Sequence, residues 1–230
     1  MRCAIMQPTY LPWSGYFNLI ASVDYFYYLD DVQYERGTWH HRNRILLGEK
    51  PHWLTVPVIR KFLGQQLKEV LLDPKQTKWR KKHSDSIKQA YSRCPYINDL
   101  SEIIDIIEFG KQTTLANVNI DLIEKICVIL DIKTLRYRSS ECNIDLPRSE
   151  KLIKLCRLAG CNEYLSPLGA KEYLLKDNFE KLSEVCLIFP NFQPTSYSQQ
   201  KVTEFISHLS ILDVIANLGI RAAKDYIRQT

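Results

Sequence analysis

Polar and aromatic side chains follow directly after the first apolar run of the chain. The run Cys3-Ala4-Ile5-Met6 is long enough for one buried strand, and the loop after it carries Gln7, Tyr10, Trp13 and Tyr16. All four side chains are large and can form hydrogen bonds, and the three rings can also stack on a flat ligand. A loop that only connects two elements does not need such residues, so we interpret it as a binding loop. The alternative is a stiff loop whose rings simply cover the core.

The residues around this loop indicate how it is positioned. Pro8 and Pro12 forbid a helix between them and push the preceding residues towards extended backbone. Gly15 then allows a turn, and residues 16–23 have one apolar helical face. The predicted order is strand, rigid loop, helix. In open α/β sheets such a loop lies at the carboxyl end of a strand, where ligands bind.

Two adjacent carboxylates follow the second predicted strand. The aromatic run Tyr25–Leu29 carries no charge, which is typical of a strand buried on both faces, and Asp30-Asp31 come directly after it. Adjacent residues of an extended chain point to opposite faces, so at most one of them is expected to face a ligand. Alternatively, the pair caps a turn.

The most polar and aromatic stretch of the chain spans residues 34–44. Arg42 and Arg44 occupy alternate positions, so in an extended segment they share one face, which suits phosphate or carboxylate. The alternative is a solvated strand face. His40 and His41 are adjacent, but no carboxylate or cysteine follows nearby at ligand spacing. A titratable base or hydrogen-bond donor is therefore favoured over a metal site.

A histidine also lies in the first long helix, predicted over residues 76–93. Trp79, His83, Ile87 and Tyr91 recur at every fourth position and so share one side of that helix. A histidine in such a stripe is often a core residue bonded to a carbonyl group. Next to tryptophan and tyrosine, however, it could equally line a pocket.

The remaining pattern predicts the fold class. The chain carries a hairpin pattern at 45–58, an apolar stretch at 67–72 that could form a further strand, and helical patterns at 102–109 and 114–130. Strands at 134–137, 163–165 and 185–189 then alternate with helices at 148–158 and 170–175, before a last helix at 207–217. This order predicts an α/β fold with a mostly parallel, Rossmann-like sheet, flanking helices and a helical middle section, in one domain spanning 1–230. In the last helix His208 and Asp213 do not match the apolar face, which favours a surface position for both.

Composition narrows the class of protein. The 230 residues are 45% hydrophobic and 25% charged, as in ordinary globular proteins, and the net charge of +5 suits an anionic small ligand but does not by itself indicate nucleic acid. The seven cysteines include no C-x-x-C pair, and no metal site is predicted. No signal peptide and no run of membrane-spanning length are recognisable. We expect a cytoplasmic protein without a membrane partner.

Taken in order, these motifs resemble the WbqC-like family of bacterial proteins over nearly the whole chain. The segments that carry the likeness are Gln7-Pro8-x-Tyr10-x-Pro12-Trp13-x-Gly15-Tyr16-Phe17, Asp30-Asp31-Val32-Gln33-Tyr34, Arg42-Asn43-Arg44-Ile45, Trp79 with His83, Tyr164-Leu165-Ser166-Pro167-x-Gly169-Ala170 with Tyr173, and His208-Leu209-Ser210-Ile211-Leu212-Asp213 followed by Gly219.

The resemblance implies a biological setting. WbqC-like proteins are associated with gene clusters for O-antigen, the outer part of lipopolysaccharide, and for other surface polysaccharides, and a role as an aminoacyl (glycine) transferase has been suggested for the family. That role implies amide formation on the amino group of a nucleotide-linked deoxyamino sugar. The alternative is a non-catalytic sugar-nucleotide-binding module of a biosynthetic complex.

Such a reaction needs a general base, donors for a developing oxyanion and a place for the nucleotide. The base candidates are His83, Asp31 and His41. The candidate substrate-binding residues are Gln7, Tyr10, Trp13, Tyr16, Arg42, Asn43 and Arg44. No recognisable nucleophile motif, Walker A loop or G-x-G-x-x-G sequence is found, so direct attack by the sugar amine is favoured. No bound cofactor is expected, and the acyl donor is left open, with a carrier protein and a charged tRNA among the candidates.

Overall fold

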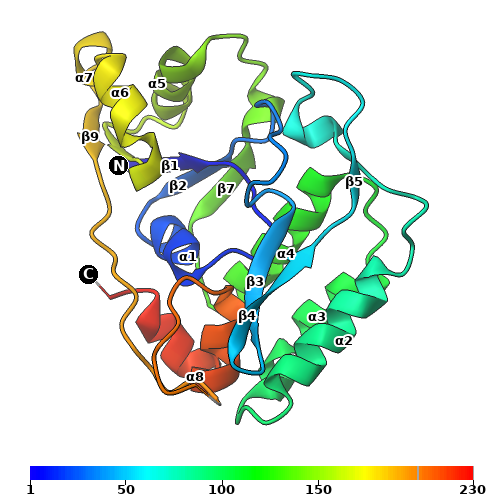
Figure 1. Cartoon of the computed structure of the whole chain (residues 1–230). Helices are drawn as coiled ribbons and strands as arrows, with labels where there is room; N and C mark the ends of the chain where they lie inside the picture. Colours follow the sequence, from blue (N-terminus) through cyan, green and yellow to red (C-terminus); the bar gives the residue numbers. More distant parts are fainter. Residues whose placement is uncertain (201, 230) are drawn as a thin grey trace.

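A five-stranded parallel sheet forms the centre of the molecule in the computed structural model, which describes residues 1–200 and 202–229 (Figure 1). Its strands are β1 (Arg2–Met6), β2 (Tyr25–Tyr28), β7 (Leu135–Arg138), β8 (Glu163–Leu165) and β9 (Cys186–Ile188). They lie in the order β7-β2-β1-β8-β9, and every neighbouring pair is parallel. The predicted α/β, Rossmann-like class is confirmed.

The strand order creates a switch point next to β1. The chain builds the sheet outwards from β1 through β2 to β7, and then returns to the other side of β1 to add β8 and β9. Loops that leave the carboxyl ends of β1 and β8 therefore turn in opposite directions and leave a crevice between them. In open α/β sheets this crevice is the usual place for a ligand.

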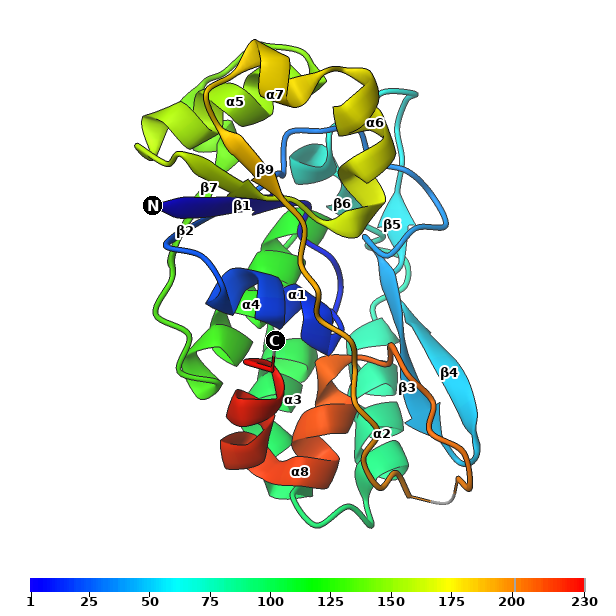
Figure 2. The ribbon, with the colours of Figure 1, turned by 90° about the vertical axis from the view of Figure 1, so that its left-hand side faces the viewer.

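Helices cover both faces of the sheet, which is seen nearly edge-on in Figure 2. One face carries α5 (Arg148–Leu158), α6 (Lys171–Lys176) and α7 (Phe179–Leu182), and the other carries α1 (Ser14–Ala21) and α4 (Leu115–Ile129). The strand residues alternate accordingly. Cys3 and Ile5 belong to the apolar cluster of α5 and α7, whereas Ala4 belongs to the cluster of α1 and α4.

A helical layer and a hairpin complete the molecule on the side of α1 and α4. The helices are α2 (Trp79–Tyr91), α3 (Ser101–Phe109) and α8 (Ile211–Tyr226), and the hairpin pairs β3 (Arg42–Leu47) with β4 (Lys50–Thr55) (Figure 2). A two-stranded sheet of β5 (Val58–Ile59) and β6 (Leu71–Leu72) follows the hairpin. The short 3-10 helices are η1 (Leu67–Glu69), η2 (Ile97–Leu100), η3 (Ser139–Cys142) and η4 (Leu168–Ala170).

The last helix differs from its prediction in two ways. It begins only at Ile211, because Ser210 forms its N-cap, and it continues past Asn217 through a kink at Gly219, whose φ is 78°. Asp213 is fully buried, where the sequence pattern favoured a surface position. Its Oδ2 accepts hydrogen bonds from Tyr197 Oη and Gln199 Nε2, both at 2.7 Å, so the loop before the helix supplies partners for this oxygen, while Oδ1 is buried without one.

Candidate functional site

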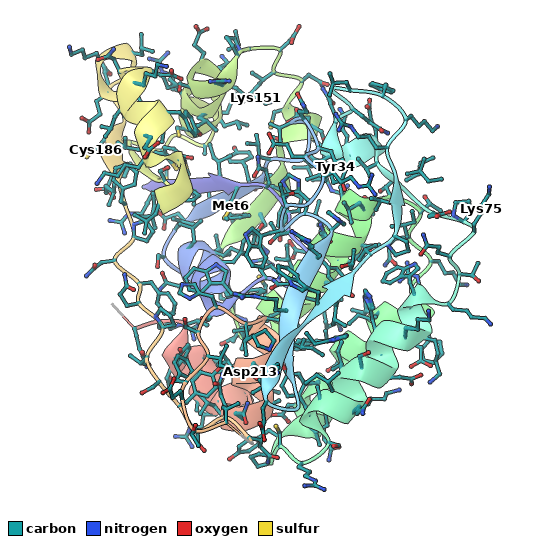
Figure 3. All side chains as sticks on the ribbon, viewed as in Figure 1. Met6, Tyr34, Lys75, Lys151, Cys186 and Asp213 are labelled. Carbon is teal, nitrogen blue, oxygen red and sulfur yellow. The ribbon has the colours of Figure 1, made fainter. Side chains whose placement is uncertain are left out.

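A cavity of about 800 Å³ opens at the carboxyl edge of the sheet, beside the switch point. It is lined by residues that follow three neighbouring strands: Gln7 after β1, Asp31 after β2 and Ser140 after β7. Further walls come from α5, which carries Lys151, and from α6, which carries Tyr173. Figure 3 shows Lys151 above the end of β1, where Met6 is labelled. We call this space the edge cavity.

The two adjacent aspartates have different environments. Asp31 lines the edge cavity, where its Oδ2 lies 2.6 Å from Lys151 Nζ and its Oδ1 accepts a 2.6 Å hydrogen bond from Ser139 Oγ. Asp30 is buried and accepts hydrogen bonds from the Ser140 backbone N–H and from Ser140 Oγ. Asp30 therefore ties the end of β2 to the end of β7, while Asp31 faces the cavity. One of the two carboxylates thus lines the cavity, although the Ser139 hydroxyl lies within hydrogen-bond distance of both.

Basic side chains surround the edge cavity. Lys151 is engaged by Asp31, whereas Lys68 and Arg148 make no ion pair within the part of the chain that the structure describes. Glu35 and Asp145 also line the cavity, so its charge is mixed. A ligand that carries both a phosphate and an amino group would find partners of the opposite charge for each.

The sequence analysis did not single out these cations. Lys151 had a detectable signal: it lies four positions before Leu155 on α5, and both are buried, so helical periodicity places this lysine on the inward stripe. Lys68 and Arg148 had no such signal, because an isolated basic residue in a turn or at a helix start is ordinarily a solvated one.

His83 occupies a different place. Its Nδ1 shares a 2.8 Å hydrogen bond with Tyr10 Oη, and both side chains are buried between α2 and the loop after β1. Burial lowers the pKa of His83 to about 4, so its ring is neutral at physiological pH. His83 does not line the edge cavity, and its predicted role as general base stays a prediction.

His41 and Asn43 hold the hairpin against its surroundings. His41 Nδ1 lies 3.2 Å from Tyr34 Oη, and burial lowers its pKa, with a further contribution from Arg42. Asn43 Nδ2 donates to the carbonyl oxygens of Tyr10 and Leu11, at 3.1 and 2.7 Å. In the described structure Asn43 thus fastens the loop after β1 to strand β3.

A second, smaller cavity lies on the other side of the same loop. It measures about 190 Å³, and we call it the aromatic slot. It is lined by Met6, Thr9, Pro12, Trp13, Tyr16, Trp39, Asn43 and His208. The ring of Trp13 lies 4.5 Å from that of His208, centre to centre. His208 is exposed, as the sequence pattern favoured, and it also forms part of this wall.

Arg42 and Arg44 share one face of β3, as their alternate spacing predicts. The Arg42 guanidinium lies 4.4 Å from the ring centre of Trp53, and that of Arg44 lies 5.5 Å from Trp39 and 5.6 Å from Trp53. The predicted site residues are therefore distributed over neighbouring places and are not gathered in one cavity. Gln7 and Asp31 line the edge cavity, Trp13, Tyr16 and Asn43 line the aromatic slot, Tyr10 and His83 pair in the core, and His41, Arg42 and Arg44 belong to the hairpin.

Residues 1–200 and 202–229 contain neither a metal-ligand cluster nor a membrane-spanning helix. Within these ranges no three side chains of histidine, cysteine, aspartate or glutamate gather closely enough to hold a metal ion. None of the helices described there combines the length and the apolar character needed to cross a membrane.

Comparison with known proteins identifies relatives of this chain by sequence. The model of the WbqC-like protein family matches residues 7–225. The uncharacterized protein Rv1507c of Mycobacterium tuberculosis is 33% identical over 229 residues, which cover 99% of this chain and 97% of that protein. No solved structure matches the chain significantly.

Proposed function

The chain belongs to the WbqC-like protein family, and from that premise we propose that it transfers an acyl or aminoacyl group to the amino group of a nucleotide-linked amino sugar. The product is an amide, glycyl among the candidates, made for a surface polysaccharide such as O-antigen. All seven cysteines are unpaired, which is compatible with work in a reducing cytoplasm.

The observation that carries this proposal is the edge cavity at the carboxyl ends of β1, β2 and β7. Its volume of about 800 Å³ lies within the range of about 300–1,000 Å³ that encloses small-molecule ligands. Lys68 and Arg148 can meet phosphate oxygens, because neither is engaged by a carboxylate among the described residues. Asp31 can meet the sugar amine.

Asp31 is the group to which we assign the proton-accepting role, because it is the one of the three base candidates that lines the edge cavity. In the proposed reaction the neutral amine nitrogen attacks the carbonyl carbon of an activated ester or thioester. A C–N bond forms, the C–O or C–S bond of the donor breaks, the amine proton passes to Asp31, and the departing alkoxide or thiolate is protonated from water. Lys151 holds the Asp31 carboxylate in place through their 2.6 Å contact.

The test is incubation of the purified protein with nucleotide-linked amino sugars and a panel of acyl donors, read by mass spectrometry. The donors comprise carrier-protein thioesters, coenzyme A esters and charged tRNA. The proposal expects one pair to give a product heavier by one acyl group. Asp31→Asn should slow this reaction by about two to four orders of magnitude while the sugar nucleotide still binds.

The second candidate is the non-catalytic sugar-nucleotide-binding module. The contacts of Asp31 favour it, since Lys151 occupies one carboxylate oxygen and the Ser139 hydroxyl the other, so neither oxygen is free to take a substrate proton. Binding of the sugar nucleotide without turnover by any donor would select this alternative over the transferase.

A further inference from the structure

We propose that the aromatic slot is a binding site for the base of a nucleotide, with Arg44 and Arg42 receiving its phosphate groups. This site is separate from the edge cavity. Only the identity of the nucleotide that it receives rests on the proposed function.

The first observation is the chemistry of the slot's lining. Met6, Pro12, Trp13, Tyr16 and Trp39 give it largely apolar walls, of which three are aromatic. At about 190 Å³ it is smaller than the roughly 300–1,000 Å³ of pockets that enclose a whole small-molecule ligand. The slot therefore fits one ring system of a larger ligand, with the rest lying outside.

The second observation is that the amide of Asn43 and the hydroxyl of Tyr16 in the slot are already engaged. Asn43 donates to two carbonyl oxygens, and its Oδ1 accepts from the Arg44 backbone N–H at 2.7 Å. The Tyr16 hydroxyl donates to the Gln7 carbonyl oxygen at 3.2 Å. Thr9, the second ring nitrogen of His208 and the indole N–H groups of Trp13 and Trp39 are left for a ligand in the described structure.

These engaged atoms decide between a sugar ring and a nucleobase. A sugar ring carries hydroxyls on most of its carbons, and each one buried without a partner costs free energy. A nucleobase presents two flat apolar faces, with polar atoms only at its edge. The slot offers rings for those faces and a few polar groups for that edge, so a base fits it better than a sugar does.

The third observation is the exposure of Trp39. This side chain lines the slot and is nevertheless 46% exposed, and its ring lies 5.3 Å from that of Trp53, which is 41% exposed. Two neighbouring tryptophans exposed to this extent present a stacking surface continuous with the slot. Base stacking on such rings is the usual source of affinity for nucleotides held without sequence readout.

The fourth observation concerns charge at the mouth of the slot. The Arg44 guanidinium lies 5.5 Å from the Trp39 ring, and that of Arg42 lies 4.4 Å from Trp53. Neither arginine makes an ion pair with a carboxylate of the described residues; Arg42 Nη2 donates to the Gly37 carbonyl oxygen, and the Nε atoms of both arginines are buried without a hydrogen-bond partner. A phosphate leaving the slot past Trp39 would meet both guanidinium groups, whose planar forks suit phosphate oxygens.

Two sources can supply such a nucleotide. One is the sugar substrate itself, through the base of its nucleotide; Arg42 and Arg44 would then take the phosphates in place of Lys68 and Arg148. The other is the acyl donor, through an adenosine such as that of coenzyme A, of an adenylate or of the end of a charged tRNA. The recognition chemistry is the same for both, so the experiment has to separate them.

The experiment is isothermal titration calorimetry of the intact chain with UDP, ADP, uridine, adenosine and inorganic pyrophosphate. A nucleoside diphosphate should bind more tightly than either its nucleoside or pyrophosphate. Preference for UDP assigns the slot to the sugar nucleotide, and preference for ADP assigns it to the donor. Equal binding of pyrophosphate and the two diphosphates would overturn the proposal, because the base would then contribute nothing.

Matched variants locate the binding. Trp39→Ala should weaken the preferred diphosphate about 10-fold or more, and Trp39→Phe should restore most of the affinity because a ring is retained. Arg44→Ala should weaken the diphosphate about 10-fold or more and leave nucleoside binding unchanged. Phe109→Ala removes an exposed ring at the far end of α3 and should change nothing.

The outcomes distinguish this site from the proposed reaction. Full affinity in both Trp39→Ala and Arg44→Ala, with both variants folded by circular dichroism, would place the nucleotide elsewhere and overturn the inference, whatever the transferase assay shows. Conversely, tight binding that depends on Trp39 in a protein without transfer activity would leave the slot assigned and remove the transferase.

Discussion

Replacing Lys151 by methionine should lower the free energy of unfolding by about 3 kcal/mol. The Lys151 and Asp31 side chains are only 10% and 9% exposed, and their charged atoms lie 2.6 Å apart. Removing one partner of a buried ion pair leaves an uncompensated charge, at a cost of about 3–5 kcal/mol. Ser139 still donates to Asp31, and the open edge cavity admits water, so the lower end of that range is expected.

The double variant Asp31→Asn/Lys151→Met separates this effect from lost packing. It removes both charges and keeps side chains of similar size, so most of the stability should return. Urea unfolding at pH 7 of the native chain, both single variants and the double variant gives the coupling energy directly. Lys81→Met is the matched control, because Lys81 pairs with Asp85 on the exposed side of α2, where water screens the pair, and its loss should be minor.

A loss below about 1 kcal/mol for Lys151→Met, with additive effects in the double variant, would refute the reasoning. It would mean that Asp31 is well hydrated and does not need Lys151. The picture of an ionised carboxylate held ready at the cavity wall would then have no energetic basis, and so would the base assignment built on it.

Three further predictions concern stability. Gly219→Ala should cost about 2 kcal/mol or more in urea unfolding, because φ is 78° there and a Cβ would lie 2.8 Å from the Tyr96 ring. Burial raises the pKa of Asp213, so this carboxyl holds its proton more readily in the folded chain, and its favourable contribution to the free energy of unfolding is lost as pH rises above about 4. In the same assay, the stability of Asp213→Asn relative to the native chain should therefore increase between pH 4 and 8. Burial lowers the pKa values of His40 and His83 to about 4, so both rings take up protons on unfolding below about pH 6.5. The free energy of unfolding should therefore fall between pH 6.5 and 4, by up to about 1.4 kcal/mol per pH unit for each histidine.

Much of the scaffold followed from local signals. The apolar run 3–6, the aromatic run 25–29 and the strand–helix alternation after residue 134 predict parallel strands, and the structure has them. The stretch 67–72 was harder: it splits into η1 and β6, and β6 pairs with β5 in a sheet of its own. Pairing partners distant in sequence decide such short strands, and the local pattern does not contain them.

The site was less predictable for a physical reason. A large polar side chain in a loop can face a ligand or fasten the loop, and the sequence pattern is the same in both cases. Asn43 and His83 fasten neighbouring elements, since their hydrogen bonds go to Leu11 and Tyr10. Lys151 faces the cavity because Asp31 comes to it from a strand 120 residues away in sequence, a contact that no local periodicity encodes.

The loop after β1 is the element on which both cavities depend. Its residue Gln7 lines the edge cavity, while Thr9, Pro12 and Trp13 line the aromatic slot. Asn119 Nδ2 donates to the carbonyl oxygens of Pro8 and His40, at 3.0 and 2.7 Å, and so fixes the loop to the start of the hairpin. The prolines and these bonds order the loop before any ligand arrives, so binding on either side of it would not have to supply that ordering entropy. Many polar groups of this loop bond within the protein, and these bonds hold in place the few side chains that are left to meet a ligand.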